Sequence, residues 1–288
     1  MHDEHLSNGS LELTVATGFG PRITEFALRD DRNSLAELGE MAIELSCGRA
    51  YRMRGGHRLW VAPEVPEITY EPDNDPVAVA RSGDTVVVTQ SAPPRVPIEK
   101  AMAVTLRAAS VEIRHRVTNR GHQEVELAPW AITQLPPGGT ALLPLPVEPA
   151  DPHGLQPNAS VVLWPYTAVN DSPFTIRDRI LLLDAVGHEA TKVGTQLIRG
   201  WLAYALDGLV FVKRAAHVAG GRYLDMGASG QCYSCLDFFE LETLGEQQLI
   251  APGAAVEHRE TWELHRIDPE TPHQEIPKLL NLDGGEPV

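Results

Sequence analysis

Apolar and polar residues alternate along several short stretches of this chain. The alternation is clearest in LELTVAT (11–17), DTVVVTQ (84–90), AMAVTLRAASVEIRHRVTN (101–119) and VEHRETWEL (256–264). Successive side chains of a β-strand point to opposite faces, so this pattern is typical of strands with one face in the core and one in water. We therefore predict β-strands in these segments.

Turn-forming residues separate the predicted strands, and only EIPKLLNL (275–282) has a helix-like pattern. Many strands without interleaved helices predict an all-β fold. For a chain of 288 residues the natural arrangement is a large two-sheet antiparallel β-sandwich. The Gly, Pro, Asn and Asp residues that favour chain reversal gather in GFGPR (18–22), EPDNDP (71–76), NRGH (119–122), LPPGG (135–139) and GEQQLIAPG (245–253).

The composition is that of one globular domain with polar ends. Hydrophobic residues make up 43% of the chain and charged residues 22%, as in ordinary folded proteins. Sandwiches of this size are commonly a single domain. We expect a polar N-terminal tail at 1–10, one β-sandwich domain at 11–267 and a C-terminal tail at 268–288.

The chain is strongly acidic, with a formal net charge of −15. A nucleic acid or an anionic membrane surface would repel it, so we predict neither as a partner. No stretch has the ~18 uninterrupted apolar residues of a membrane helix, and MHDEHLSNGS at the start lacks the basic and apolar regions of a signal peptide. We expect a cytoplasmic protein, and the sequence leaves its oligomeric state open.

Common motifs for metals and cofactors are missing from the sequence. Cys232 and Cys235 form a CYSC tetrapeptide inside an apparent strand with no second pair, so we expect structural cysteines. The 11 histidines form no HxH or HExxH pattern, and there is no GxSxG, Walker or GxGxxG motif. We therefore predict no metal and no cofactor.

Three clusters combine polar side chains with aromatic rings at strand-to-loop boundaries. The first is RGGHRLWVAPE (54–64), which is followed by YEPDNDP (70–76). Its donors, acceptors and indole surface suit a polyhydroxylated ligand. The alternative is that the Gly-Gly pair is only a turn, that the arginine pairs with an acid and that the tryptophan is core. The candidate ligand-binding residues here are His57, Arg58, Trp60, Glu64, Asp73 and Asn74.

The second and third clusters are LAPWAITQLPPGG (127–139) and LWPYTAVNDSP (163–173). Sugars present apolar C–H faces to aromatic rings and hydroxyls to polar groups, so this mixture in loops favours a sugar-binding role. Each aromatic residue taken alone is equally consistent with a place in the core. The candidates are Trp130, Gln134, Trp164, Tyr166 and Asp171.

Two carboxylates share one face of the predicted strand in CLDFFELETLG (235–245). Glu240 and Glu242 would lie ~7 Å apart, where each raises the proton affinity of the other and one can act as a general base. The alternative is a solvated outer face. Lys213 ends the apolar stretch of LVFVKRAAH (209–217), where it is either a strand-end charge or a group that binds a phosphate or carboxylate.

Several of these segments resemble the galactose-mutarotase-like superfamily, which includes aldose 1-epimerases and hexose-phosphate epimerases. The similarity covers residues 15–265 and is carried by RGGHRLWVAPE, by VTNRGHQEVELAPWAITQL (117–135) and by ELETLG (240–245) with LIAPGAAVEHRETWEL (249–264). The resemblance implies the two-sheet supersandwich of that superfamily. It also implies that Glu242 is the catalytic base.

The resemblance fails at the family's catalytic acid. The family has a histidine near the position of Pro129–Ala131, where this sequence has none, and His57 is the available substitute. In the family's reaction a glutamate removes the anomeric hydroxyl proton while an acid protonates the ring oxygen. Two functions therefore stay open. One is epimerisation of a hexose or hexose derivative, and the other is a noncatalytic sugar-binding or sensing domain.

Overall fold

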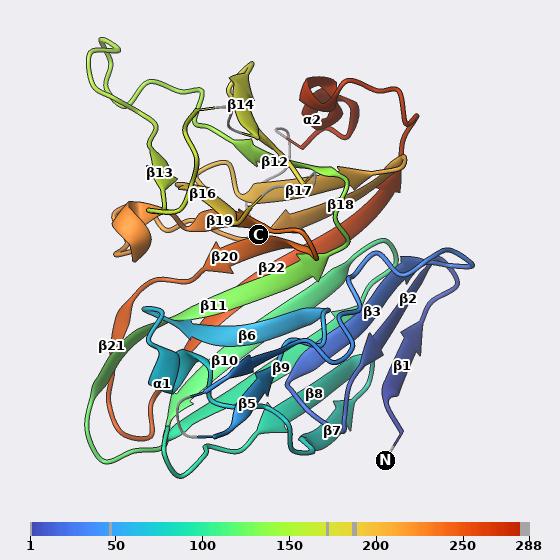
Figure 1. The fold of residues 1–288 in the computed structure, drawn as a ribbon, viewed down its shortest axis with the longest axis vertical. Helices are drawn as coiled ribbons and strands as arrows, with labels where there is room; N and C mark the ends of the chain where they lie inside the picture. Colours follow the sequence, from blue (N-terminus) through green and yellow to red (C-terminus); the bar gives the residue numbers. More distant parts are fainter. Residues whose placement is uncertain (1, 46–47, 171–172, 186–188, 283–288) are drawn as a thin grey trace.

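Two large antiparallel sheets form the body of the molecule in the computed structural model, which describes residues 2–45, 48–170, 173–185 and 189–282 (Figure 1). Nearly all regular structure in these residues is strand, so the predicted all-β, two-sheet antiparallel sandwich is confirmed. The part of the chain described here contains no helix long and apolar enough to span a membrane.

The first sheet contains, in spatial order, β1 (Glu4–Ser7), β2 (Leu11–Val15), β3 (Arg22–Leu28), β6 (His57–Ala62), β11 (Val125–Leu135), β20 (Phe239–Leu244), β19 (Gly230–Ser234), β16 (Thr191–Thr195) and β13 (Val161–Leu163), with β21 (Gln248–Ile250) paired to β11. The second sheet contains β14 (Phe174–Arg177), β15 (Ile180–Asp184), β12 (Thr140–Pro144), β17 (Trp201–Leu206), β18 (Leu209–Arg214), β22 (Ala255–Arg266), β10 (Val111–Asn119), β9 (Ile98–Leu106), β8 (Thr85–Gln90) and β7 (Ala78–Ser82).

Several short strands and helical turns lie outside the two large sheets. A hairpin of β4 (Ala42–Glu44) and β5 (Ala50–Arg52) and the single helical turn α1 (Pro66–Thr69) precede β7 in the chain. The 3₁₀ turn η1 (Asp225–Gly227) precedes β19. Near the C-terminus, η2 (His273–Glu275) leads into α2 (Ile276–Leu279), within the segment whose pattern was helix-like.

The alternation seen in the sequence follows the exposure of each strand. Along β10, Val111, Ile113 and His115 are buried, whereas the intervening Glu112 and Arg114 are exposed. The central strand β6 is buried on both faces and shows no such alternation, whereas β20 is buried throughout yet alternates apolar residues with Glu240 and Glu242. Sequence periodicity therefore identifies strands with a wet face more readily than strands at the centre of the molecule.

The main core fills the space between the sheets, where Phe26, Phe211 and Trp262 pack their rings together. Both predicted tails contribute structure of their own. Residues 4–7 form the edge strand β1 because Leu6 is buried against the sheet. In the predicted C-terminal tail, Ile276 packs in a separate apolar cluster with Trp201 on the second sheet.

Candidate functional site

A cleft of about 430 Å³ opens on the face of the first sheet that points away from the second sheet. Side chains of β6, β11, β16, β19 and β20 contribute to it, together with residues of the β4 region and of several connecting loops. Its lining consists of Met41, Ala42, Ile43, Met53, Arg58, Trp60, Glu64, Tyr70, Trp130, Tyr166, Ala190, Lys192, Tyr233, Phe238 and Glu240.

Strand register brings these side chains together from distant parts of the sequence. Trp60 on β6 lies opposite Trp130 on β11. Glu240 on β20 lies between Gln134 on β11 and Tyr233 on β19. Side chains of directly opposed residues project from the same face of a sheet, so the register alone gathers aromatic and polar groups there.

Glu240 is held by two donors through a single oxygen. Its Oε1 accepts hydrogen bonds from Arg58 Nη2 at 2.8 Å and from Gln134 Nε2 at 2.9 Å. The Arg58 guanidinium also lies 4.1 Å from the centre of the Trp60 ring. Within the described residues, the buried Nε and Nη1 of Arg58 and the Oε1 of Gln134 have no hydrogen-bond partner. These buried atoms therefore keep unused hydrogen-bonding capacity beneath the cleft.

Glu242 is likewise held through one oxygen, and it lies deeper. Its Oε2 accepts hydrogen bonds from Lys192 Nζ at 2.7 Å and from Trp130 Nε1 at 2.8 Å. Its Oε1 is buried without a hydrogen-bond partner in the part of the chain described. Burial raises the pKa of Glu242, Lys192 opposes the shift and Glu240 adds to it. A carboxylate with a raised pKa and an unused oxygen is suited to accept a proton.

Lys192 lies between Glu242 and the cleft. It belongs to the lining, whereas Glu242 is fully buried. Its Nζ is 4.6 Å from the centre of the Trp130 ring and 4.9 Å from that of Trp164. Two aromatic faces and a carboxylate hold the ammonium group in place.

A second layer of hydrogen bonds fixes the aromatic wall of the cleft. Trp60 Nε1 donates to the Tyr51 hydroxyl at 2.9 Å. The same hydroxyl accepts from Arg22, whose guanidinium also pairs with Asp73 at 2.9 Å. At the rim, the Tyr70 hydroxyl donates to Glu64. Asp73 therefore supports the wall and does not line the cleft.

The structure gathers most of the residues that the sequence analysis selected for a sugar site. Gln134 and Glu242 lie directly beneath the lining, and Trp164 reaches it through Lys192. Asn74 is exposed away from the cleft, where it contacts Arg54 and the Ala50 carbonyl. Asp171 lies outside the described residues. The selected residues that line the cleft are Arg58, Trp60, Glu64, Trp130, Tyr166 and Glu240.

Two selected residues, His57 and Lys213, lie on the wrong side of the sheet for this cleft. Both are completely buried between the two sheets. Lys213 Nζ pairs with Glu260 Oε1 at 2.9 Å and donates to the carbonyls of Ala131 and Leu241. His57 and Lys213 therefore lie outside the cleft. The geometry does not support the predicted roles of His57 as catalytic acid and of Lys213 as ligand-binding cation.

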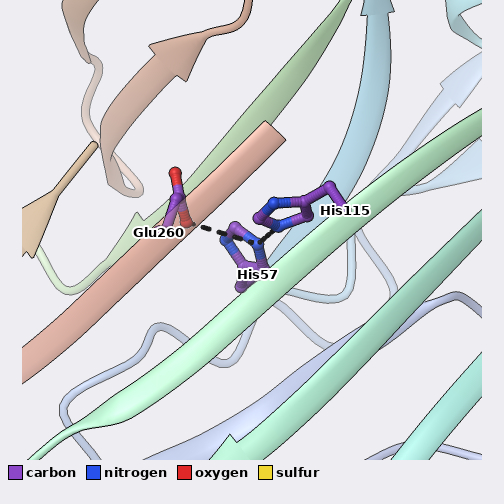
Figure 2. A group of neighbouring side chains, drawn as sticks. All are labelled: His57, His115 and Glu260. Carbon is purple, nitrogen blue, oxygen red and sulfur yellow. Dashed lines mark hydrogen bonds and ion pairs between the residues drawn. The ribbon is translucent and has the colours of Figure 1, made fainter. Parts of the chain in front are cut away.

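Figure 2 shows His57 beside His115 and Glu260 in this interior network. His57 Nε2 lies 2.8 Å from His115 Nε2, and His115 Nδ1 lies 3.2 Å from the His258 carbonyl oxygen. A carbonyl only accepts, so His115 Nδ1 donates and its Nε2 accepts from His57. The remaining His57 Nδ1 then accepts from Thr133 Oγ1 at 2.9 Å. Neutral imidazoles thus satisfy one another in a continuous chain.

The interior network also has the composition of a metal site. Ligand atoms of His57, His115 and Glu260 lie within 4.8 Å of one another, although the three residues are far apart in the sequence and no spacing rule finds them. Both oxygens of Glu260 are already used, because Oε1 accepts from Lys213 and Thr243 while Oε2 accepts from Trp262 at 3.0 Å. A divalent ion would sit close to the Lys213 ammonium, so a hydrogen-bonded network explains the geometry better.

Several cleft residues were missed by the sequence reasoning. Lys192 lies in the unremarkable stretch TKVGT of β16, and no local pattern marks it as functional. Tyr233 lies between the two cysteines of CYSC, a segment in which only the cysteines were considered as candidates. Tyr70 was part of a selected segment but was not itself chosen. Only the strand order brings Lys192 and Tyr233 next to Glu240 and Glu242.

No family model matches the sequence of this chain. No curated protein matches it either. Solved structures do match in fold. The Slr1438 protein of Synechocystis sp. PCC 6803 is 12% identical, with 92% of this chain and 96% of that chain covered and a TM-score of 0.63. A galactose mutarotase-like protein from Lactobacillus casei ATCC 334 is also 12% identical, with 92% and 100% covered and a TM-score of 0.58.

The same fold is present in a longer neighbour. A TPR-domain containing protein from Parabacteroides distasonis ATCC 8503 is 12% identical, and the match covers 93% of this chain but 48% of that chain, with a TM-score of 0.58. Together with the two ten-stranded sheets and the cleft on the outer face of the first, these likenesses establish that this chain has the galactose-mutarotase-like fold.

Proposed function

We propose that the cleft binds a small carbohydrate and that the protein interconverts the anomers of a hexose or hexose derivative. The binding part rests on the lining. Tyr166 and Tyr233 offer aromatic surfaces to the C–H faces of a sugar above the buried Trp60 and Trp130. Arg58, Glu240 and Lys192 offer donors and acceptors to its hydroxyls. The galactose mutarotase-like neighbour from Lactobacillus casei supports the same ligand class.

One observation carries the catalytic part. Glu242 keeps a buried oxygen without a hydrogen-bond partner in the described residues, and burial raises the pKa of this carboxyl group. The oxygen can accept the anomeric hydroxyl proton once the sugar reaches it beside Lys192. Loss of that proton opens the ring, and the aldehyde carbon can then be attacked from either face when the ring closes. Glu240, which two donors hold in place, orients the neighbouring hydroxyls.

The test begins with a thermal-shift screen against monosaccharides, sugar phosphates and uronic acids, because a ligand that binds the folded state raises its melting temperature. Exchange between the α and β anomers of each hit is then followed by NMR or polarimetry. Glu242→Gln preserves side-chain size but accepts no proton. We expect it to lower the exchange rate by ~10²–10⁴ and to change affinity far less.

The matched control is Glu112→Gln on the exposed face of β10, which should retain the wild-type rate. Wild-type protein that binds a sugar but leaves its mutarotation unaccelerated would refute the catalytic part. It would support the noncatalytic sugar-binding alternative, which the lack of a histidine at Pro129–Ala131 favours. Full activity of Glu242→Gln would refute only the role of this residue.

A further inference from the structure

We propose that Lys192 is the catalytic acid that protonates the ring oxygen of the sugar. This inference rests on the proposed epimerase function and supplies the group for which the sequence had no histidine. Lys192 lines the cleft, and its Nζ donates to Glu242 Oε2 at 2.7 Å. The pair therefore offers a proton donor and a proton acceptor side by side at one end of the ligand site.

The spacing of this pair suits the two oxygens that change their protonation. The anomeric hydroxyl oxygen and the ring oxygen are bonded to the same carbon, so one acid and one base in contact can reach both. The Oε1 of Glu242 is buried just beneath the lining and has no hydrogen-bond partner in the described residues, so it would take the anomeric hydroxyl once the sugar displaces the side chains above it, while Lys192 Nζ keeps further N–H groups for the ring oxygen. The rings of Trp130 and Trp164 hold the ammonium beside this position.

The step balances within the pair. Glu242 takes the proton of the anomeric hydroxyl, the C1–O1 bond becomes a carbonyl, the bond between C1 and the ring oxygen breaks, and that oxygen takes a proton from Lys192. Glu242 is then protonated and Lys192 is a neutral amine. Lys192 Nζ is hydrogen-bonded to the other oxygen, Oε2, at 2.7 Å, so a rotation of the protonated carboxyl group that exchanges its two oxygens delivers the proton to the amine and restores both groups. The reverse steps close the ring on the other face of the aldehyde.

The other donors near the cleft fit the role less well. Arg58 does not release its proton in proteins. Burial raises the pKa values of Tyr70, Tyr166 and Tyr233, so these phenols are weaker acids than usual. In the described residues Glu242 accepts from Trp130 and Lys192 and from none of the three tyrosines, so the phenol protons have no direct return path.

The experiment compares anomer exchange in wild type, Lys192→Met, Lys192→Arg and Lys192→Ala, with a sugar that wild type converts. We expect Lys192→Met and Lys192→Arg to lose ~10²–10⁴ in rate with far smaller changes in affinity, since arginine keeps the charge but yields no proton. Added methylammonium should restore part of the Lys192→Ala rate, and amines of lower pKa should restore more. A residue that only supports the fold would not produce this dependence on amine pKa. The control is Lys278→Ala on the exposed side of α2, which should be unaffected by the amines.

Each outcome decides between the two proposals. If wild type converts the sugar and a folded Lys192→Met or Lys192→Arg variant keeps its rate, the acid role is refuted and the epimerase function stands. Thermal melting identifies which variants fold, and Lys192→Arg supplies the answer if the shorter side chains do not fold. If wild type binds the sugar without converting it, the epimerase function fails, and the role of Lys192 fails with it.

Discussion

Each face of the first sheet carries a buried pair of a lysine and a glutamate, and the two pairs differ in whether all their polar atoms have hydrogen-bond partners. On the interior face, Lys213 pairs with Glu260 at 2.9 Å, and on the cleft face Lys192 pairs with Glu242 at 2.7 Å. Among the described residues, no buried polar side-chain atom of the interior pair or of the neighbouring His57 lacks a hydrogen-bond partner, whereas Oε1 of Glu242 does.

The electrostatics of the two carboxylates differ accordingly. Burial acts to raise the pKa of Glu260, but Lys213, His115 and His258 more than offset it, so the pKa is lowered. The pKa of Glu242 stays raised because burial outweighs its single cation. A completed network stabilises one charge state and specifies packing, whereas an incomplete one retains the capacity to bind and to accept a proton. The same residue types thus serve the fold on one face and the ligand on the other.

The largest effect should come from breaking the interior pair. Lys213→Met leaves Glu260 as an uncompensated charge in the core, which costs ~3–5 kcal/mol of unfolding free energy. Lys192→Met should cost less than half as much, because Glu242 already has a raised pKa and takes up a proton more readily than Glu260. Urea denaturation of both variants at neutral pH measures the difference.

A double variant serves as the control for this comparison. Replacing both partners, in Lys213→Met with Glu260→Gln, removes the buried charge and should recover at least half of the lost stability. Equal losses for Lys213→Met and Lys192→Met would contradict the distinction between the two faces.

A smaller effect should follow from acidification of the interior network. Burial lowers the pKa of His258 from 6.5 to about 3, with Glu260 opposing the shift and His115 and Lys213 adding to it. Below pH 6.5 the His258 imidazole becomes protonated in the unfolded chain but stays neutral in the folded protein. Unfolding free energy should therefore fall by about 1.4 kcal/mol per pH unit for this histidine as the pH drops from 6.5 towards 3.

Denaturation curves between about pH 6.5 and pH 5 lie above the ordinary titration range of carboxylates and measure this slope. The pKa values of His57 and His115 are also lowered by burial, so they contribute in the same direction. His258→Gln should reduce the slope without abolishing it. A slope that is identical in the variant and in wild type would show that His258 is not held neutral in the folded protein.

The smallest effect should come from the rim of the cleft. Trp164 is half-buried and contacts Lys192 through its ring face. Trp164→Ala should weaken sugar binding by ~1 kcal/mol and leave the melting temperature nearly unchanged. Trp164→Phe keeps an aromatic ring and should lose less affinity. Titration calorimetry with a sugar from the screen gives both values, and an unaltered affinity in Trp164→Ala would remove this residue from the site.

The sequence predicted the class of fold and several of the segments that line the cleft, but not β16 or the residues around β4. RGGHRLWVAPE contributes both Arg58, which lines the cleft, and His57, which lies in the interior network. Adjacent residues of a strand point to opposite faces, so one of the two had to face away from the ligand. All six positions of β6 are buried, and hydrophobicity therefore could not tell which face carries the site.

The sequence by itself determined the antiparallel sandwich, because alternation and turn residues are local properties that each strand carries independently of its neighbours. It also placed Glu240 and Glu242 on one face, since strand geometry has a period of two. Only the tertiary structure decided that Lys192 belongs to Glu242 and Lys213 to Glu260. Strand order and register set those pairs, and they follow from contacts between segments far apart in the chain, which no local pattern records.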